Sequence, residues 1–472
     1  MGNTTTASVT GAQVAPAKSA IKDLPIAKVW AFAVGQFGWA LLSGIISNWL
    51  VYFYQPDQEA ISQGQTVFVP QGLVVLGIVT VVGGITAFAR FFDAFVDPAV
   101  ASLSDRCDAK SGRRMPFLKF AALPLAVVTV LVFWSPINGT SWVNAAFLFV
   151  TVIGYYIALT FYCTPYNALI AELGHDSKQQ LTISTAISFT WVAGTAIAYV
   201  APVIWGAFVP MIGRITAIRV TFTIMAAVAF VCMLVPPLAI REKDYVNSHP
   251  TSESTIESLK QTFGDGEFRK FVCSDVVYWV AITTFQTGLP FFVTSLLKLP
   301  ETTTTIYFVL MTGVSVLFYL PVNILANKVG KKRLLLVAFV IFTCAFAFAG
   351  ALGSAVLGFI PAMAQGLVLS VVGAIPMAAF GILPQAIVAN IADASSKTTG
   401  QDRQGMFYAA RTFAMKMGQS VAMLLFTGVS TIGMASGAGY RIAAVCAAVL
   451  CGLGGIVFAF YNEKKVLGVL AT

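Results

Sequence analysis

Two aspartates lie four residues apart inside one of the most apolar stretches of the chain, residues 86–98. A charged side chain at the centre of a bilayer costs roughly 2.5–3.5 kcal/mol, so a carboxylate in such a stretch points to a function. On a helix the spacing of Asp93 and Asp97 puts both carboxylates on one face, and Arg90 joins that face one turn away. We therefore expect this face to line a polar cavity.

The acidic pair suits two kinds of chemistry. Two carboxylates on adjacent turns supply several oxygen ligands and compensating charge for a hard monovalent cation. The same two groups can instead share a proton, because like charges held close together disfavour double ionisation. The residues do not distinguish Na⁺ from H⁺. A purely structural alternative pairs Asp93 or Asp97 with Arg90 or Lys416 to hold helices together.

The composition describes the elements that must position this pair. Hydrophobic residues make up 57% of the chain and charged residues 10%, with a mean hydropathy of +0.81. These values are typical of an all-α membrane protein that crosses the bilayer many times. Apolar windows of about 20 residues predict twelve transmembrane helices near residues 27–54, 71–103, 117–135, 142–172, 181–209, 217–240, 270–298, 303–326, 334–353, 355–391, 404–432 and 440–461.

The basic residues indicate the orientation of these helices. With both termini in the cytoplasm, most of the 29 Lys and Arg residues fall in cytoplasmic segments, as the positive-inside rule requires. This explains the net charge of +9 without nucleic acid, because no basic stripe is interleaved with stacking aromatics. The exceptions are Arg214, Arg219, Lys298 and Arg441 on the outer side, and Arg90, Arg411 and Lys416 within spans.

Histidine and cysteine usage excludes several other chemistries. The chain has two histidines, His175 and His249, and both fall in predicted cytoplasmic loops. The seven cysteines form no C-x-x-C pair and mostly lie in apolar runs, so neither a zinc site nor a disulfide framework is indicated. No nucleophile elbow or phosphate-cradling glycine loop is present, and we do not expect an enzyme or a cofactor.

The chain also contains an internal repeat. The basic turn after the second predicted helix, with Asp105, Arg106, Arg113 and Arg114, is echoed by residues 325–333, about half the chain later. We therefore expect two pseudo-symmetric six-helix bundles. The predicted organisation is a disordered cytoplasmic tail (1–26), an N-terminal bundle (27–240), a cytoplasmic linker (241–269), a C-terminal bundle (270–462) and a second cytoplasmic tail (463–472).

These motifs resemble those of the major facilitator superfamily. Asp105-Arg106 followed by Gly112-Arg113-Arg114 is similar to the loop signature of that superfamily, with an insertion inside it. The chain more narrowly resembles the glycoside–pentoside–hexuronide:cation symporters, of the melibiose-permease type, over nearly all of residues 27–462. The motifs that carry this resemblance are Arg90-Phe-Phe-Asp93-Ala-Phe-Val-Asp97-Pro98, Pro165-Tyr166-Asn167-Ala168-Leu169 through Glu172-Leu173, and Gly405-Met-Phe-Tyr408 through Lys416-Met-Gly418-Gln419.

The resemblance implies a major facilitator fold and a cation site. In that family the two helix-II carboxylates bind the coupling ion, which implies this role for Asp93 and Asp97 with Na⁺, H⁺ or Li⁺ as the ion. Matching threonines are Thr160 and Thr412, and the lysine that approaches the same cavity matches Lys416.

The sugar anchors of the melibiose-permease type are missing from this chain. Where that type has acidic residues on helices I and IV, this sequence has Ala40 and Cys163, and residues 184–187 on helix V include no arginine. Without those charge-assisted hydrogen bonds, the same sugar contacts are in doubt. The remaining candidate substrate contacts are Gln36, Trp39, Tyr162, Cys163, Asn167, Arg411 and Lys416, with Trp191 and Gln286 as further possibilities; for the aromatic residues ordinary packing is a strong alternative.

Other charged residues suit conformational roles. Arg90 is a cavity charge that could bind substrate, tune the acidic pair or neutralise it. We expect the cytoplasmic gate to involve Asp105, Arg106, Arg113, Glu172 and Asp275.

Taken together, these features predict a cation-coupled symporter that works by alternating access. The resemblance favours a sugar or glycoside as cargo, and an anionic amphiphile such as a lysophospholipid is the alternative. A facilitative pore or a receptor on the same fold is a weaker alternative, since neither needs paired carboxylates. We expect a monomer in the plasma (inner) membrane, in contact with lipid and with a small-molecule substrate.

Overall fold

The computed structural model of the protein describes residues 23–75, 77, 79–107, 109, 111–174, 177–246, 262–399, 404–433 and 436–471. Most of the predicted N-terminal tail and most of the predicted linker lie outside these residues. The described parts form two halves of the chain, which we call the N-terminal half (residues 23–246) and the C-terminal half (residues 262–471).

Helices make up nearly all of the N-terminal half. They are α1 (Ile26–Tyr54), α2 (Gln58–Ser62), α3 (Val81–Asp105), α4 (Met115–Val132), α5 (Trp142–Leu173), α6 (Ser177–Tyr199), α7 (Ala201–Ile212), α8 (Arg214–Ala239) and the 3₁₀ turn η1 (Glu242–Asp244).

The C-terminal half is helical as well. It contains α10 (Gly266–Phe291), the π-helical turn η2 (Phe292–Leu296), α11 (Thr302–Val329), α12 (Lys331–Ala351), the 3₁₀ turn η3 (Ala355–Leu357), α13 (Ala362–Thr399), α14 (Gln404–Val429), α15 (Ala438–Ala459) and α16 (Glu463–Ala471).

Ten helical stretches in the described residues are long and apolar enough to cross a membrane. α3 and α14 are not among the ten, although their 25 and 26 residues exceed the roughly 20 that a bilayer requires. α3 carries Arg90, Asp93 and Asp97, and α14 carries Arg411 and Lys416. The two long helices that are not among the ten are therefore the ones that carry the acidic pair and Lys416.

Three predicted spans differ from the observed helices. The span predicted to begin at residue 71 begins only at Val81, because Thr80 caps the helix by accepting a 3.0 Å hydrogen bond from the Gly83 amide. Residues before it turn through Gly72 and Gly77, which have positive φ. The span predicted over 355–391 begins at Ala362 and extends to Thr399, and the span over 181–209 is divided into α6 and α7.

The two halves repeat the same helix contacts. In the N-terminal half α1 packs on α6 and α8, α4 packs on α5 and α8, and α3 packs on α5. In the C-terminal half α10 packs on α14 and α15, α12 packs on α13 and α15, and α11 packs on α13. The same correspondence relates two contacts between the halves. If α3 corresponds to α11 and α6 to α14, then the contact of α3 with α14 and the contact of α6 with α11 are two copies of one contact.

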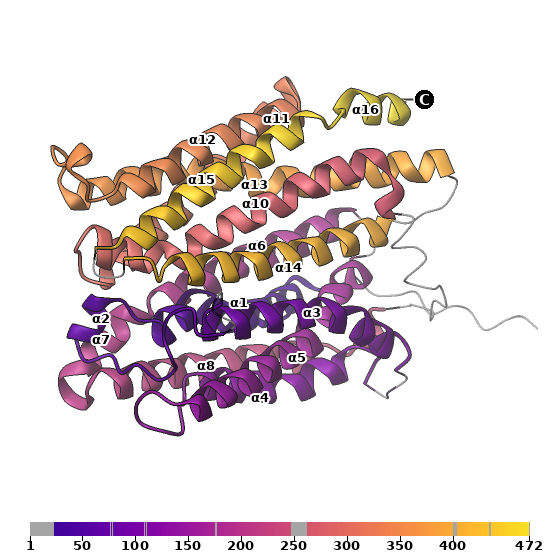
Figure 1. Ribbon diagram of the computed structural model, residues 1–472. Coiled ribbons are helices and arrows are strands. Elements are labelled where there is room, and N and C mark those ends of the chain that lie inside the picture. Colours follow the sequence, from indigo (N-terminus) through magenta and orange to yellow (C-terminus); the bar gives the residue numbers. More distant parts are fainter. Residues whose placement is uncertain are drawn as a thin grey trace, which may run out of the picture.

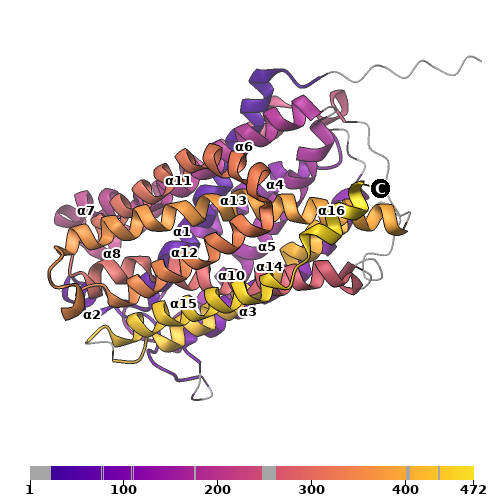
Figure 2. The same ribbon diagram turned by 90° about the horizontal axis from the view of Figure 1, so that it is seen from above.

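Figure 1 shows most helices of the C-terminal half above those of the N-terminal half, with all long helices running in similar directions. α2 and α7 lie at one end of the molecule, and the C-terminus lies at the other end in both views (Figures 1 and 2). We call these the outer end and the cytoplasmic end, following the orientation that the charge distribution predicts.

Small residues allow the helices of the N-terminal half to pack closely. A Cβ added at Gly38 of α1 would lie 2.6 Å from the Ala229 carbonyl oxygen of α8. One added at Gly194 of α6 would lie 2.6 Å from the Phe37 carbonyl oxygen of α1. Both distances are too short for a real contact, so glycine at these positions is what lets the backbones approach.

Candidate functional site

Asp93 and Asp97 lie on the face of α3 that packs against the C-terminal half. Asp93 is buried and Asp97 is partly buried. The Lys416 ammonium of α14 bridges them, with Nζ 2.7 Å from Asp93 Oδ2 and 2.5 Å from Asp97 Oδ2. One cation thus serves two carboxylates, so the cluster holds more negative than positive charge.

Two threonines of α5 complete this cluster from the other side. Thr160 Oγ1 donates a 2.5 Å hydrogen bond to Asp93 Oδ1, and Thr164 Oγ1 donates a 3.2 Å hydrogen bond to Asp97 Oδ1. Each carboxylate therefore has one hydroxyl and a share of one ammonium. We call these five residues, Asp93, Asp97, Thr160, Thr164 and Lys416, the central site.

Thr164 was not predicted from the sequence. A signal for it was present, because Thr160 and Thr164 have the same four-residue spacing as Asp93 and Asp97 and therefore share one helix face. Only the packing of α3 on α5 shows that the two threonines face the two aspartates, Thr160 opposite Asp93 and Thr164 opposite Asp97. The alternating carboxylates and hydroxyls form a donor set that suits a hard monovalent cation or a proton.

Arg90 lies one turn before Asp93 and spans the two halves. Its guanidinium donates 2.5 Å and 3.2 Å hydrogen bonds to Gln419 Oε1 of α14 and to Ser47 Oγ of α1. It also lies 5.5 Å from the centre of the Tyr156 ring on α5. Arg90 is thus held by neutral polar groups and a π face, and the acidic pair is left to Lys416.

The structure does not bring Thr412 to the acidic pair. Thr412 is exposed, and its hydroxyl donates a 3.0 Å hydrogen bond to the Tyr408 carbonyl of its own helix. Cys163 and Asn167, by contrast, continue the side of α5 that carries Thr160 and Thr164; Cys163 is partly buried and Asn167 is exposed.

Of the residues predicted to contact substrate, Gln36 and Trp39 contact each other, and Tyr162 holds two helices together. Trp39 Nε1 donates a 3.2 Å hydrogen bond to Gln36 Oε1, and the Trp39 ring lies 4.9 Å from that of Trp191 on α6. Tyr162 instead joins helices, because it is fully buried and its hydroxyl donates a 2.9 Å hydrogen bond to the Met233 carbonyl of α8. Gln286 is partly buried on α10.

Arg411 and Asp275, predicted for two different functions, form one ion pair. The Arg411 guanidinium contacts both carboxylate oxygens of Asp275, at 2.8 Å and 3.1 Å, and both side chains are buried. The pair joins α14 to α10 within the C-terminal half. Arg411 is therefore committed to a carboxylate of its own half and lies outside the central site.

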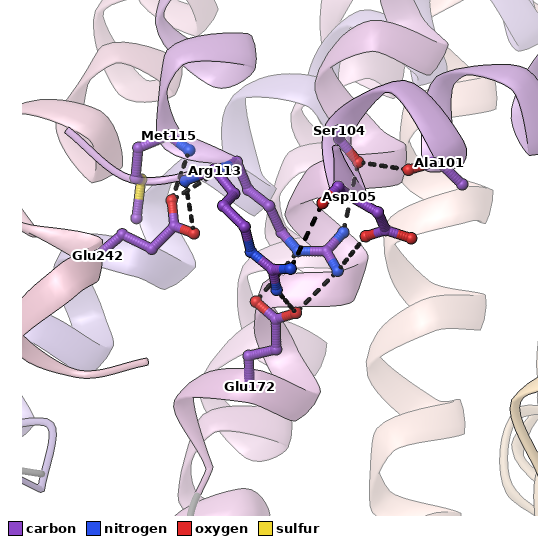
Figure 3. Close-up of polar contacts among 8 residues, drawn as sticks. Ala101, Ser104, Asp105, Arg113, Met115, Glu172 and Glu242 are labelled. Atoms are coloured by element: carbon purple, nitrogen blue, oxygen red, sulfur yellow. Dashed lines mark hydrogen bonds and ion pairs between the residues drawn. The ribbon is translucent and has the colours of Figure 1, made fainter. Parts of the chain in front are cut away.

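Three of the predicted gate residues meet at the cytoplasmic end of the N-terminal half (Figure 3). Glu172 accepts from both nitrogens of the Arg114 fork, at 2.8 Å and 3.1 Å, and from Arg113 at 3.2 Å. Asp105 pairs with Arg114 at 2.8 Å. Arg106 is exposed at the end of α3. These contacts tie together α3, α4 and α5.

Glu242 adds a second layer to this corner. Its carboxylate accepts hydrogen bonds from the backbone amides of Arg113, Arg114 and Met115 at 2.8–3.0 Å, at the start of α4 (Figure 3). A carboxylate at this position satisfies free amides and complements the helix dipole. Gly112, with a φ of 121°, makes room, since a Cβ there would lie 2.2 Å from Glu242 Oε2.

The C-terminal half repeats this device with Glu463. Glu463 accepts from the amides of Lys331 and Lys332 at 3.0 Å and 3.2 Å, at the start of α12 and next to Gly330 with its φ of 97°. In each half, a glutamate that follows the last long helix caps the helix after the basic turn. The internal repeat predicted from the basic turns thus extends to residues that the sequence analysis did not pair.

Comparison with known families gives one match that covers most of the chain. A family model described as MFS/sugar transport protein matches residues 31–462. The central site, both basic turns and all the long helices except the first residues of α1 fall inside this range.

Several similar curated proteins are named as symporters or sugar carriers. The inner membrane symporter YicJ of Escherichia coli (strain K12) is 26% identical over 226 residues, which cover 47% of each chain. YjmB of Bacillus subtilis (strain 168), named an uncharacterized symporter, is 23% identical over 359 residues, 74% of this chain and 75% of that protein. The isoprimeverose transporter of Lactiplantibacillus pentosus is 24% identical over 37% of this chain and 33% of its own.

Solved structures of transporters share the fold. The nucleoside transporter NupG superposes with a TM-score of 0.62 at 14% identity, covering 92% of this chain and all of that chain. A proton-dependent oligopeptide transporter structure gives a TM-score of 0.65 at 10% identity, over 95% of this chain. At these identities the likeness concerns the fold alone. The family model, with the relatives named as symporters and sugar carriers, shows that the chain belongs to the MFS/sugar transport protein family and within it to the glycoside–pentoside–hexuronide:cation symporters, which are membrane transporters and not enzymes.

Proposed function

We propose that the protein is a cation-coupled symporter of a sugar or glycoside. The observation that carries this proposal is the central site, where two carboxylates of one half share a single lysine of the other half and each accepts one hydroxyl. Each carboxylate oxygen of this cluster has a partner, but the direct contacts supply one cation for two carboxylates. A monovalent cation or a proton supplies the missing charge.

In this proposal Lys416 and the coupling ion compete for the same oxygens. When the ion binds, the ammonium need no longer neutralise both carboxylates, and the contact between α3 and α14 changes. A ligand can shift a conformational equilibrium only through different affinities for the two states. Because Lys416 comes from the other half, ion binding at this position would favour one arrangement of the halves over another.

The fold proposed for this function has twelve membrane spans in two six-helix bundles, with both termini in the cytoplasm of a monomer in the plasma (inner) membrane. The repeated helix contacts and the repeated glutamate caps support this division. α3 and α14 complete the count, since their charges face each other and Lys416 reaches the acidic pair directly.

The cargo proposal draws on relatives and on the aromatic pair near the middle of α1. Related proteins are named isoprimeverose transporter, glucuronide carrier protein homolog and glycoside/cation symporter. The rings of Trp39 and Trp191 are in contact at a tilt of 59°, and Gln36 accepts a hydrogen bond from Trp39. Aromatic faces with a nearby amide suit a sugar ring. These observations favour a sugar over an amphiphilic lipid.

The proposal can be tested by transport in proteoliposomes. Uptake of labelled sugars, glycosides and hexuronides would be measured with Na⁺, Li⁺ and H⁺ gradients imposed in turn, for the parent protein and for Asp93→Asn and Asp97→Asn. We expect one gradient to drive accumulation and both variants to lose it by at least about 30-fold, as for a buried charge that has lost its partner. Asp244→Asn, an exposed carboxylate in η1, is the matched control.

Two results would contradict the proposal. One is accumulation that is independent of every cation gradient. The other is gradient-driven accumulation that persists undiminished in both aspartate variants.

A further inference from the structure

A second set of buried polar contacts joins the two halves at the outer end of the molecule. Glu301 at the start of α11 is buried and meets Arg214 at the start of α8, with Oε2 2.7 Å and Oε1 3.1 Å from the guanidinium nitrogens. Tyr52 of α1 donates to the same carboxylate at 3.0 Å, and Trp205 of α7 donates at 2.5 Å. Three donors of the N-terminal half thus converge on one carboxylate of the C-terminal half.

Asp57 makes the reciprocal contact. It is almost fully buried, at 1% exposure, and lies between α1 and α2 of the N-terminal half. Its Oδ2 accepts hydrogen bonds from Thr294 at 2.6 Å and Ser295 at 2.5 Å, both in η2 of the C-terminal half. Its Oδ1 accepts from the Ala60 amide at 2.8 Å and so caps α2.

Gln55 supplies a third contact between the halves nearby. Its amide nitrogen donates 2.9 Å hydrogen bonds to the Thr427 carbonyl and to Ser430 Oγ, at the outer end of α14. All three contacts lie where α2 and α7 are seen, at the end opposite the C-terminus (Figures 1 and 2). We call the set of Gln55, Asp57, Arg214, Thr294, Ser295 and Glu301 the outer latch.

We infer that the outer latch is a conformational lock that closes the outer end of the transporter and must break for that end to open. Each of its contacts has one partner in each half, so separation of the halves at this end breaks all of them together. The inference rests on the proposed alternating-access function for its meaning in transport, but the contacts themselves need no cargo or ion.

The polar nature of the latch suits a reversible lock. For a buried ion pair, the loss of hydration nearly cancels the mutual attraction, so a closed pair and a separated, hydrated pair have similar free energies. An apolar contact of the same size would instead favour closure, because opening would expose it to water. Removal of one partner alone leaves an unpaired buried charge, which penalises the closed state.

The latch also gives a reason for an exception noted in the sequence. Arg214 is one of four basic residues predicted on the outer side, where the positive-inside rule disfavours them. Its guanidinium contacts Glu301, Gln63 and Gln65, and Arg214 is buried together with Glu301 and Gln65. Arg214, which the positive-inside rule disfavours at this position, is therefore the basic residue that forms the ion pair of the latch.

Hydrogen–deuterium exchange on the full-length protein tests the inference without a substrate or a coupling ion. In Glu301→Gln, Arg214 loses its counter-charge while the shape of the side chain is kept. We expect amides in residues 50–66 and 290–306 to exchange at least about tenfold faster, because the open state becomes more populated. Peptides at the cytoplasmic end, such as residues 112–120, should be unchanged.

A matched control and a rescue variant make the result specific. Asp275→Asn breaks an equally buried carboxylate–arginine pair that lies within the C-terminal half, and it should leave exchange at residues 50–66 unchanged. The exchanged pair Arg214→Glu with Glu301→Arg should restore part of the protection that either single change removes.

Three outcomes would overturn the inference. They are unchanged exchange at the outer end in Glu301→Gln, equal acceleration at both ends of the molecule, and the same acceleration at residues 50–66 in Asp275→Asn. A failure of cation-driven uptake in proteoliposomes would overturn the proposed function instead and leave these exchange results standing.

Discussion

The central site and the Glu301–Arg214 pair of the outer latch both join the two halves through buried charges, but their charges are balanced differently. In the latch pair, the carboxylate of Glu301 faces the guanidinium of Arg214, and further donors saturate it. At the central site, Asp93 and Asp97 share Lys416, so one negative charge remains uncompensated. A saturated pair can only close or open, whereas an unsaturated cluster can also accept an ion.

The two clusters also differ in their basic residue, which is an arginine in the latch and a lysine in the central site. The planar guanidinium of Arg214 holds Glu301 through two parallel hydrogen bonds, a geometry that fixes both partners. The Lys416 ammonium is a compact charge on a flexible side chain. It can therefore leave its carboxylates without breaking a bidentate pair of hydrogen bonds. Both clusters lie between the halves. What distinguishes a lock from a binding site is the chemistry of the partner residues.

Removal of the lysine should break this comparison most strongly. In Lys416→Met the acidic pair loses its competitor, and we expect the coupling cation to bind at least tenfold more tightly, about 1.4 kcal/mol, while uptake falls steeply because the ion is not released. Arg214→Met, the same change at the latch, should leave cation affinity unchanged. Calorimetric titration of Na⁺ or Li⁺ and of protons would measure this, and weaker cation binding in Lys416→Met would contradict it.

The two threonines sharpen the description of the central site. Hydrogen bonds to charged groups contribute about 1.5–3 kcal/mol, so Thr160→Val should weaken cation binding by about tenfold or more. Thr164→Val should have a smaller effect, because its bond to Asp97 is longer and less buried. Thr129→Val is the control, since that buried hydroxyl bonds only to the Leu125 carbonyl of its own helix. Equal effects for all three variants would indicate general destabilisation.

The glutamate caps test whether location between the halves matters at all. Glu242→Gln weakens three hydrogen bonds to backbone amides within one half and should lower stability by about 1–2 kcal/mol, seen as a lower unfolding temperature in detergent. Glu463→Gln, which has two such bonds, should have a smaller effect. Neither variant should change hydrogen exchange at residues 50–66. A change there would show that the latch responds to loosening anywhere in the protein.

The smallest effect is expected for Thr412. The family resemblance assigned this residue to the cation site, whereas the structure shows it exposed and bonded to its own helix. Thr412→Val should therefore leave cation affinity within about twofold of the parent, as for a surface substitution. A loss as large as that in Thr160→Val would mean that α14 rotates to bring Thr412 to the site in another state of the transport cycle.

Much of the site was predictable because its signals are local. The spacing of Asp93 and Asp97 shows a shared face wherever the helix lies, and charges within an apolar run indicate a cavity. Thr164 was missed because one threonine in an apolar helix is unremarkable until its neighbour is known. Arg411 was predicted to contact substrate, but its side chain pairs with Asp275 of α10.

The edges of two helices were also wrong for a physical reason. Residues 71–80 and 355–361 are apolar enough to extend a span. However, Thr80 caps α3, which begins at Val81, and the 3₁₀ turn η3 and then Pro361 come before α13. Hydropathy records transfer to lipid and does not record where backbone hydrogen bonds begin.

Composition, periodic apolar runs and charge placement were sufficient to predict the helical membrane fold, the repeat and the acidic pair, because each depends on residues close together in the chain. The partners of those residues depended on packing between helices that are far apart in the chain. Lys416 is 319 residues from Asp97, and Glu301 is 87 residues from Arg214. Buried charges are stable only when matched by other groups, and the match is made where helices meet. Only the tertiary structure therefore distinguishes the acidic pair that shares one lysine from the saturated pair of Glu301 with Arg214.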